Sequence, residues 1–99
     1  MMLPLVVRHE AEQEFDAAIS WYMEQAPPEW GHQFMSAVHH AFDKIQTHPE
    51  QFNFHRLGTR HYQLRQFPYD IHYLVEPDRI VVIAVFHRRR DDNALSERL

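Results

Sequence analysis

The chain has 99 residues, of which 44% are hydrophobic and 24% are charged, and it contains no cysteine. This length allows one domain, residues 1–99, and the composition is that of a folded rather than a disordered protein. The absence of cysteine excludes disulfides and thiolate metal sites and fits a reducing compartment. The longest apolar run, 80–86, is shorter than the roughly 20 residues of a membrane helix. Residues 1–7 have neither the basic leader nor the cleavage site of a signal peptide, so we expect a cytoplasmic protein without membrane contacts.

The net charge of −4 is unevenly distributed along the chain. Residues 1–50 contain two basic and eight acidic side chains, whereas residues 51–99 contain eight arginines and six acidic side chains. An acidic protein is poorly suited to broad nucleic-acid binding. Arginine binds carboxylate and phosphate groups through its planar, forked donors, so an anionic partner is expected to bind the C-terminal half.

The N-terminal half predicts one strand and two helices. Leu3–Val7 is a short β-branched segment, and we expect it to be an edge strand or a strand start because it contains a proline. From residue 10 to about residue 26, apolar side chains recur at helical spacing, and Pro27-Pro28 ends this helix. Pro28 can begin a second helix, which runs to about Thr47. Because the connection is short, the two helices form an antiparallel hairpin.

The C-terminal half predicts three strands. Residues 49–59 read as a loop, and the expected strands are 60–66, 69–76 and 79–87, with a turn at Pro77-Asp78. Residues 91–99 are expected to form a helical turn or a frayed tail. The resulting order is β-α-α-β-β-β, an α+β fold in which the helical hairpin packs on one face of a small, mostly antiparallel sheet.

Alternation along these strands assigns side chains to the two faces of the sheet. The side chains expected on the helix face are Tyr62, Leu64, Tyr69, Ile71, Tyr73, Val75, Ile80, Val82, Ala84 and Phe86. Those expected on the opposite, open face are His61, Gln63, Arg65, Asp70, His72, Leu74, Val81, Ile83, Val85 and His87. A face that mixes arginine, histidine and apolar side chains is seldom left bare, so we infer a binding surface there.

Several segments together resemble a known family. Trp21-Tyr22 ends the first predicted helix, 34–45 is followed by His48-Pro49, and the strand pair 67–73 and 80–85 is followed by 87–91. In this order and at this chain length they resemble the RelE/ParE superfamily of bacterial toxins. The resemblance implies the toxin of a type II toxin–antitoxin (plasmid stabilisation) module, a cognate antitoxin, and either DNA gyrase or the translating ribosome as target.

The two branches of this superfamily differ in their chemistry. RelE-like members cleave ribosome-bound mRNA, which requires a base, a cation for the developing phosphorane charge and an acid. The matching catalytic residues here would be Arg65 as a phosphate clamp and His87 as acid or base. The lysine cluster of that branch is missing, since Lys44 is the only lysine and lies on the second predicted helix. We therefore favour the ParE-like branch, whose members inhibit gyrase by binding it.

The resemblance also suggests which residues contact partners. The expected target-binding residues are Arg65, Tyr69, His72, His87, Arg88, Arg89 and Arg90. The expected antitoxin-binding residues are Trp21, Tyr22, Trp30, Leu74 and Val81. The acidic first half favours an amphipathic antitoxin segment that bears Lys or Arg, and operator DNA would be contacted only through the antitoxin.

Some of the predicted target-binding residues could instead have a purely structural role. The run 88–90 can be solvated and paired with Asp91 and Asp92, and Arg65 can pair with Asp70. We expect no cofactor and no metal, because no two histidines are four residues apart. No serine has the glycine-flanked setting of a nucleophile. Three hypotheses remain: a gyrase inhibitor, a ribosome-dependent endoribonuclease, and a non-toxic remnant that acts only in an antitoxin autorepressor complex.

Overall fold

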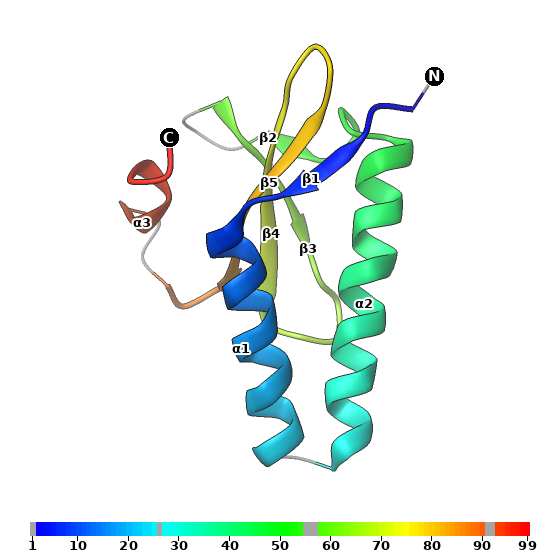
Figure 1. The fold of residues 1–99 in the computed structure, drawn as a ribbon, viewed down its shortest axis with the longest axis vertical. Coiled ribbons are helices and arrows are strands. Elements are labelled where there is room, and N and C mark those ends of the chain that lie inside the picture. The colour runs from blue at the N-terminus through cyan, green and yellow to red at the C-terminus, as the bar shows by residue number, and fades with distance from the viewer. Residues whose placement is uncertain (1, 26, 55–57, 91–92) are drawn as a thin grey trace.

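The structure, a computed structural model, describes residues 2–25, 27–54, 58–90 and 93–99. Figure 1 shows two long helices side by side against a twisted sheet, with a short C-terminal helix apart from them. The elements are β1 (Leu5–Val7), α1 (His9–Gln25), α2 (Pro28–Thr47), β2 (Asn53–Phe54), β3 (Arg60–Gln63), β4 (Tyr69–Val75), β5 (Ile80–His87) and α3 (Asn93–Ser96). The predicted α+β fold is confirmed.

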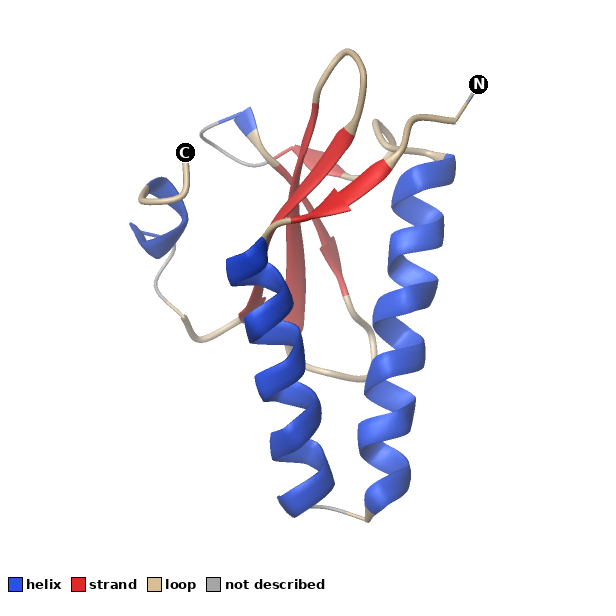
Figure 2. Ribbon diagram, in the orientation of Figure 1, coloured by secondary structure: helices blue, strands red, loops and turns tan. Residues whose placement is uncertain are grey.

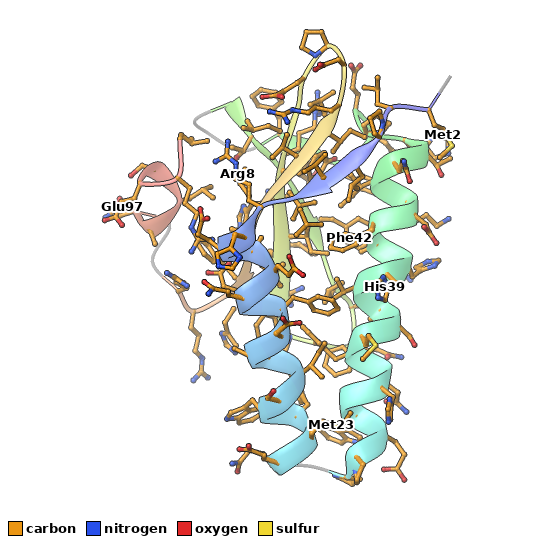
Figure 3. All side chains as sticks on the ribbon, in the orientation of Figure 1. Met2, Arg8, Met23, His39, Phe42 and Glu97 are labelled. Carbon is orange, nitrogen blue, oxygen red and sulfur yellow. The ribbon has the colours of Figure 1, made fainter. Side chains whose placement is uncertain are left out.

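The helical hairpin forms as the apolar spacing predicts. Pro28 is the first residue of α2, where its missing N–H costs no hydrogen bond. Near the tip of the hairpin the helices approach so closely that a Cβ on Gly31 would lie 2.7 Å from Met23 Sδ, and Figure 3 shows Met23 at this place. Further along, Phe42 lies between the helices, its ring centroid 6.4 Å from that of Phe15 (Figure 3).

The sheet has the strand order β1-β5-β4-β3-β2, in which only the β1–β5 pair is parallel. Figure 2 shows the strands behind the two long helices. β2 lies within the segment predicted to be a loop, because Asn53 and Phe54 pair with the start of β3. Two residues are too few to give an alternating pattern, so the sequence does not reveal this edge strand.

The predicted assignment of faces holds for the first half of β5 and is wrong for its second half. Tyr73 pairs with Val82, whereas the neighbouring His72 pairs with Ala84, so β5 has one extra residue at this point. Such a β-bulge reverses the alternation beyond it. Val85 and His87 consequently lie on the helix side, not on the open face as predicted. Ala84 and Phe86, predicted on the helix side, lie on the far side.

The C-terminal tail covers part of the far face of the sheet. Leu95 of α3 is fully buried and packs in one cluster with Val81, Ile83 and Phe86. The guanidinium groups of Arg90 and Arg98 lie 4.3 and 4.9 Å from the centroid of the Phe86 ring. The face predicted to be open is therefore occupied over β5 by the chain's own tail.

A carboxylate closes the outer edge of β5 beyond the residues that pair with β1. The backbone N–H of Val85 donates to Glu14 Oε1 over 3.0 Å. Arg98 donates to both oxygens of Glu14, at 2.7 and 2.8 Å, and to the carbonyl oxygen of Ile83 at 3.0 Å. An exposed sheet edge invites pairing with another chain, and here two side chains satisfy the edge instead.

Candidate functional site

Five residues, Leu64–Pro68, connect β3 to β4, and hollows surround this loop, which we call loop 64–68. Two of its residues are anchored in the core, since Leu64 and Phe67 are 3% and 6% exposed. The backbone closes the loop through hydrogen bonds from Leu64 N–H to the carbonyl of Tyr69, 3.0 Å, and from Tyr69 N–H to that of Phe67, 2.8 Å. Its other three side chains are exposed.

On the α1 side of loop 64–68 lies a hollow of about 290 Å³ with aromatic walls. Its lining residues are Trp21, Tyr22, Pro68, Tyr69 and His87. The rings of Tyr69 and His87 are 5.2 Å apart and nearly perpendicular, as are those of Trp21 and Tyr22. We call this the aromatic hollow.

A second hollow continues the first around the tip of the hairpin. It has the same volume, about 290 Å³, shares Tyr22 and Pro68 with the aromatic hollow, and adds Trp30. Trp21 and Trp30 are 55% and 49% exposed, which is a large area of indole to leave in water. Exposed aromatic side chains beside a hollow are typical of a protein–protein contact.

His87 is held in one orientation at the aromatic hollow. Its Nδ1 accepts a hydrogen bond of 3.1 Å from the backbone N–H of Arg89, so the neutral ring has its proton on Nε2. Burial raises the pKa of Tyr22 and of Tyr69, and for Tyr22 the neighbouring Tyr69 adds to the shift. Both phenols are thus protonated at neutral pH and can donate a hydrogen bond to a bound partner, but they cannot act as bases.

The side chain of Arg65, within loop 64–68, lines a hollow on the α2 side of the loop and not the aromatic hollow. It lines a cleft of about 500 Å³ between α2 and the end of β3, together with Lys44 of α2. None of the described hollows contains both Arg65 and His87. The prediction that these two residues share the open face of the sheet is wrong: the bulge turns His87 toward the helices, and β3 ends before Arg65.

Comparison with known proteins assigns the chain to a family. The model described as "ParE toxin of type II toxin-antitoxin system, parDE" matches residues 5–92. The chain belongs to this ParE toxin family. A solved structure described as "Chromosomal ParDE TA system from P. aeruginosa" matches with a TM-score of 0.78 at 18% identity, covering 87% of this chain and 96% of that one. Curated protein sequences contain no match.

In this ParE family member, two of the three consecutive arginines have intramolecular partners. Arg88 Nε donates to Asp70 Oδ1 at 2.9 Å, and its Nη2 donates to the carbonyl of Leu64. Arg90 donates to Glu14 Oε2 at 2.8 Å. Asp70 is therefore the partner of Arg88 and not of Arg65. The alternative pairing with Asp91 and Asp92 lies outside the described residues.

The remaining predicted residues lie on the far face. His72 and Val81 are 4% and 2% exposed, and Leu74 is half-buried against the cluster that includes Leu95. Val81 is thus buried by the toxin itself. Its predicted role as an antitoxin contact requires an exposed side chain, so that prediction is wrong. Sequence reasoning missed Glu14, whose four hydrogen bonds join segments more than 70 positions apart.

The described part of this ParE chain contains no cluster of three His, Cys, Asp or Glu side chains that could hold a metal ion. Among the same residues, no helix has the length and hydropathy needed to cross a membrane.

Proposed function

We propose that this ParE family toxin inhibits DNA gyrase by binding and that a cognate antitoxin neutralises it. The family match over residues 5–92 is the observation on which the proposal rests. Gyrase is a cytoplasmic enzyme, so we place the action of the toxin in the cytoplasm and within a plasmid- or chromosome-stabilising module.

The arrangement of the candidate catalytic residues favours binding over RNA cleavage. A ribosome-dependent nuclease needs a cation beside its acid or base, because the phosphorane charge develops next to the proton transfer. Here Arg65 and His87 line separate hollows, and the nearby Arg88 is already bound to Asp70 and Leu64.

We assign the aromatic hollow and the hollow that adjoins it to the target, and with them Trp21 and Trp30, which the family resemblance suggested as antitoxin contacts. Trp and Tyr side chains in desolvated pockets contribute most of the binding energy at protein interfaces. Trp21, Trp30 and Tyr69 border adjoining hollows, and Trp21 and Trp30 are about half exposed, so a gyrase segment could bury them without unfolding the toxin.

The antitoxin is assigned to the acidic side of the hairpin. Glu12 and Asp16 are exposed and lie one helical turn apart on the same side of α1, and among the described residues neither side chain forms an ion pair. Their charge is complementary to an amphipathic segment with Lys or Arg, which would extend from α1 toward Trp21.

A supercoiling assay with purified gyrase tests the target. We expect the toxin to inhibit supercoiling and to increase cleaved DNA, and the double variant W21A/W30A to lose both effects. Arg79→Gln, an exposed change at the β4–β5 turn, is the control and should inhibit as the unaltered toxin does.

Primer extension on mRNA from induced cells distinguishes the alternatives. Cuts within codons that disappear in Arg65→Ala and His87→Ala, with gyrase unaffected, would replace the proposal by the RelE-like reading. Normal growth under strong induction without antitoxin would instead indicate the non-toxic remnant.

Titration calorimetry with the protein encoded next to this one tests neutralisation. We expect a complex that weakens about fivefold or more in the double variant E12Q/D16Q, because two charges are removed from the docking face. Failure of this neighbour to bind the unaltered toxin would refute the antitoxin assignment.

A further inference from the structure

The cleft between α2 and loop 64–68 has no role in the function proposed above. It has a volume of about 500 Å³ and is lined by Ala37, His40, Lys44, Tyr62, Leu64, Arg65 and Gln66. None of these side chains is acidic, although the chain as a whole has a net charge of −4. We call it the cationic cleft.

The two permanent cations of this cleft have no carboxylate partner among the described residues, unlike four arginines elsewhere in the chain. Arg79, Arg88, Arg90 and Arg98 each form an ion pair with a carboxylate. Within the described residues, neither the side chain of Lys44 nor that of Arg65 forms a hydrogen bond or an ion pair. Lys44 and Arg65 therefore have no side-chain partner among the described residues, and both line the same cleft.

The walls of the cleft place these charges opposite each other. Lys44 and His40 are four residues apart on α2 and lie on one side of the helix, whereas Arg65 belongs to the loop on the other side. The apolar part of the lining includes Ala37 of α2 and Leu64 of the loop. A carboxylate between the walls could accept hydrogen bonds from both, while its methylene groups contact the apolar floor.

The cleft continues along α2 into a neighbouring hollow. The two share Ala37 and Gln66, and the second adds Gln33 and Ser36. Amide and hydroxyl side chains at intervals along a groove are suited to the N–H and C=O groups of an extended peptide.

From this geometry we propose that the cationic cleft binds an extended, acidic peptide segment of a partner protein. A carboxylate of that segment lies between Lys44 and Arg65, and its backbone follows α2 toward Gln33. The cationic cleft shares no lining residue with the aromatic hollow, whereas Gln33 and Gln66, at the far end of the peptide path, also line the hollow beside Trp30.

Nucleic acid is a weaker candidate for the same cleft. Tight binding to nucleic acid uses many phosphate contacts, and this cleft offers two permanent cations beside a histidine. Base stacking also requires an available ring, whereas Tyr62 packs against Phe52 with a centroid distance of 4.8 Å.

Fluorescence anisotropy with a labelled hexaglutamate peptide tests the proposal at low ionic strength. We expect saturable binding to the full chain, and binding about tenfold or more weaker in K44Q/R65Q, because two charge-assisted contacts are lost. The control Arg79→Gln removes a cation outside the cleft and should change affinity less than about twofold. Thermal unfolding of each variant verifies that it is folded.

Competition then separates a peptide from a phosphate ligand. Unlabelled hexaglutamate should displace the probe at lower concentration than inorganic polyphosphate or a single-stranded oligothymidylate. The proposal is overturned if the polyanions compete better, if hexaglutamate binds K44Q/R65Q as tightly as the unaltered chain, or if the unaltered chain shows no saturable binding.

Discussion

Arginine side chains have opposite roles at two places along the sheet. At the edge of β5, Arg90 and Arg98 both bind the carboxylate of Glu14, and all three side chains are fixed. Beside α2, Arg65 and Lys44 face a cleft without any described partner. We call the first region the Glu14 cluster.

The difference follows from what each region must satisfy. The edge of β5 has backbone groups without a strand partner, and unsatisfied buried groups destabilise a fold. The charged side chains of Glu14 and Arg98 are bound there because they complete the hydrogen bonds of the Val85 N–H and the Ile83 carbonyl. The cationic cleft lies beside a loop whose backbone is already bonded, so its charges are available to another molecule. We therefore expect changes in the Glu14 cluster to affect stability and changes around loop 64–68 to affect binding.

The largest loss of stability is expected for Glu14→Ala. The change leaves Arg98, 14% exposed at its side chain, without a counter-ion and the N–H of Val85 without an acceptor. Removing one partner of a largely buried pair costs about 3 kcal/mol, which urea unfolding would measure as a lower midpoint with an unchanged slope.

Two further variants show whether the loss comes from the Glu14 carboxylate. Glu14→Gln retains an acceptor for Val85 but not the charge, so its loss should be smaller. Glu12→Ala removes an exposed carboxylate from the same helix and should change stability by less than about 0.5 kcal/mol. Equal losses at positions 12 and 14 would contradict the structural role of the Glu14 cluster.

The next largest effect is expected for Leu95→Ala, which tests the attachment of the tail. Leu95 is fully buried against Val81 and Phe86. Truncation of a buried leucine costs about 2–4 kcal/mol, and less where the site can collapse, so we expect about 2 kcal/mol for this short helix near the chain end. Amide exchange should increase on the far face of β5 and not in α2. Unchanged exchange on β5 would show that the tail does not cover it.

Tyr73 provides a pH-dependent contrast with the tyrosines of the aromatic hollow. Burial raises the pKa of Tyr73 to about 12, from an ordinary value of 10.0. Below pH 10 both states are protonated, whereas between pH 10 and 12 the unfolded chain loses the proton first. The free energy of unfolding should therefore fall by up to about 2–3 kcal/mol over that interval.

Tyr73→Phe isolates this contribution. It removes the hydrogen bond of 2.7 Å from the hydroxyl to the carbonyl of Pro49, so it should be less stable than the unaltered chain at pH 8 by about 1 kcal/mol. Between pH 10 and 12 its free energy of unfolding should fall by about 2–3 kcal/mol less than that of the unaltered chain. The contributions of Tyr22 and Tyr69 cancel in this comparison, because both tyrosines are present in both proteins. Parallel pH profiles of the two proteins would show that Tyr73 is not the buried phenol responsible.

The fold was predictable because its signals are local and repeated. Both helices follow from apolar spacing and from Pro27-Pro28 and His48-Pro49. β5 follows from its β-branched run, and β3 and β4 follow from alternating apolar side chains. The bulge in β5 was not predictable, since all residues from 80 to 86 are apolar and no alternation marks the change of face. One extra residue was enough to move His87 to the other side of the sheet.

The candidate site was only partly predictable for a related reason. Trp21, Tyr22 and Trp30 were predicted as antitoxin contacts, and they line the hollows at the hairpin tip, but the partner that they contact stays a prediction. The partners of Glu14 and Arg88 were not, because each pairing depends on how the finished fold brings distant segments together. For the same reason the sequence did not predict that Lys44 and Arg65 line one cleft. The two residues are separated by 20 intervening positions and by the strands β2 and β3.

Apart from the control Glu12→Ala, the smallest effect on stability is expected for Trp21→Ala and Trp30→Ala. Each indole is about half exposed, and Trp21 makes one described ring contact, with Tyr22 at 5.2 Å. Loss of an exposed ring at a helix surface should cost less than about 1 kcal/mol, the more so because alanine favours the helix. Urea unfolding of the two single variants, compared with Glu14→Ala, measures this directly. A loss of about 3 kcal/mol at either position would make that tryptophan part of the core, and the aromatic hollow would then no longer be the surface free to bind a target.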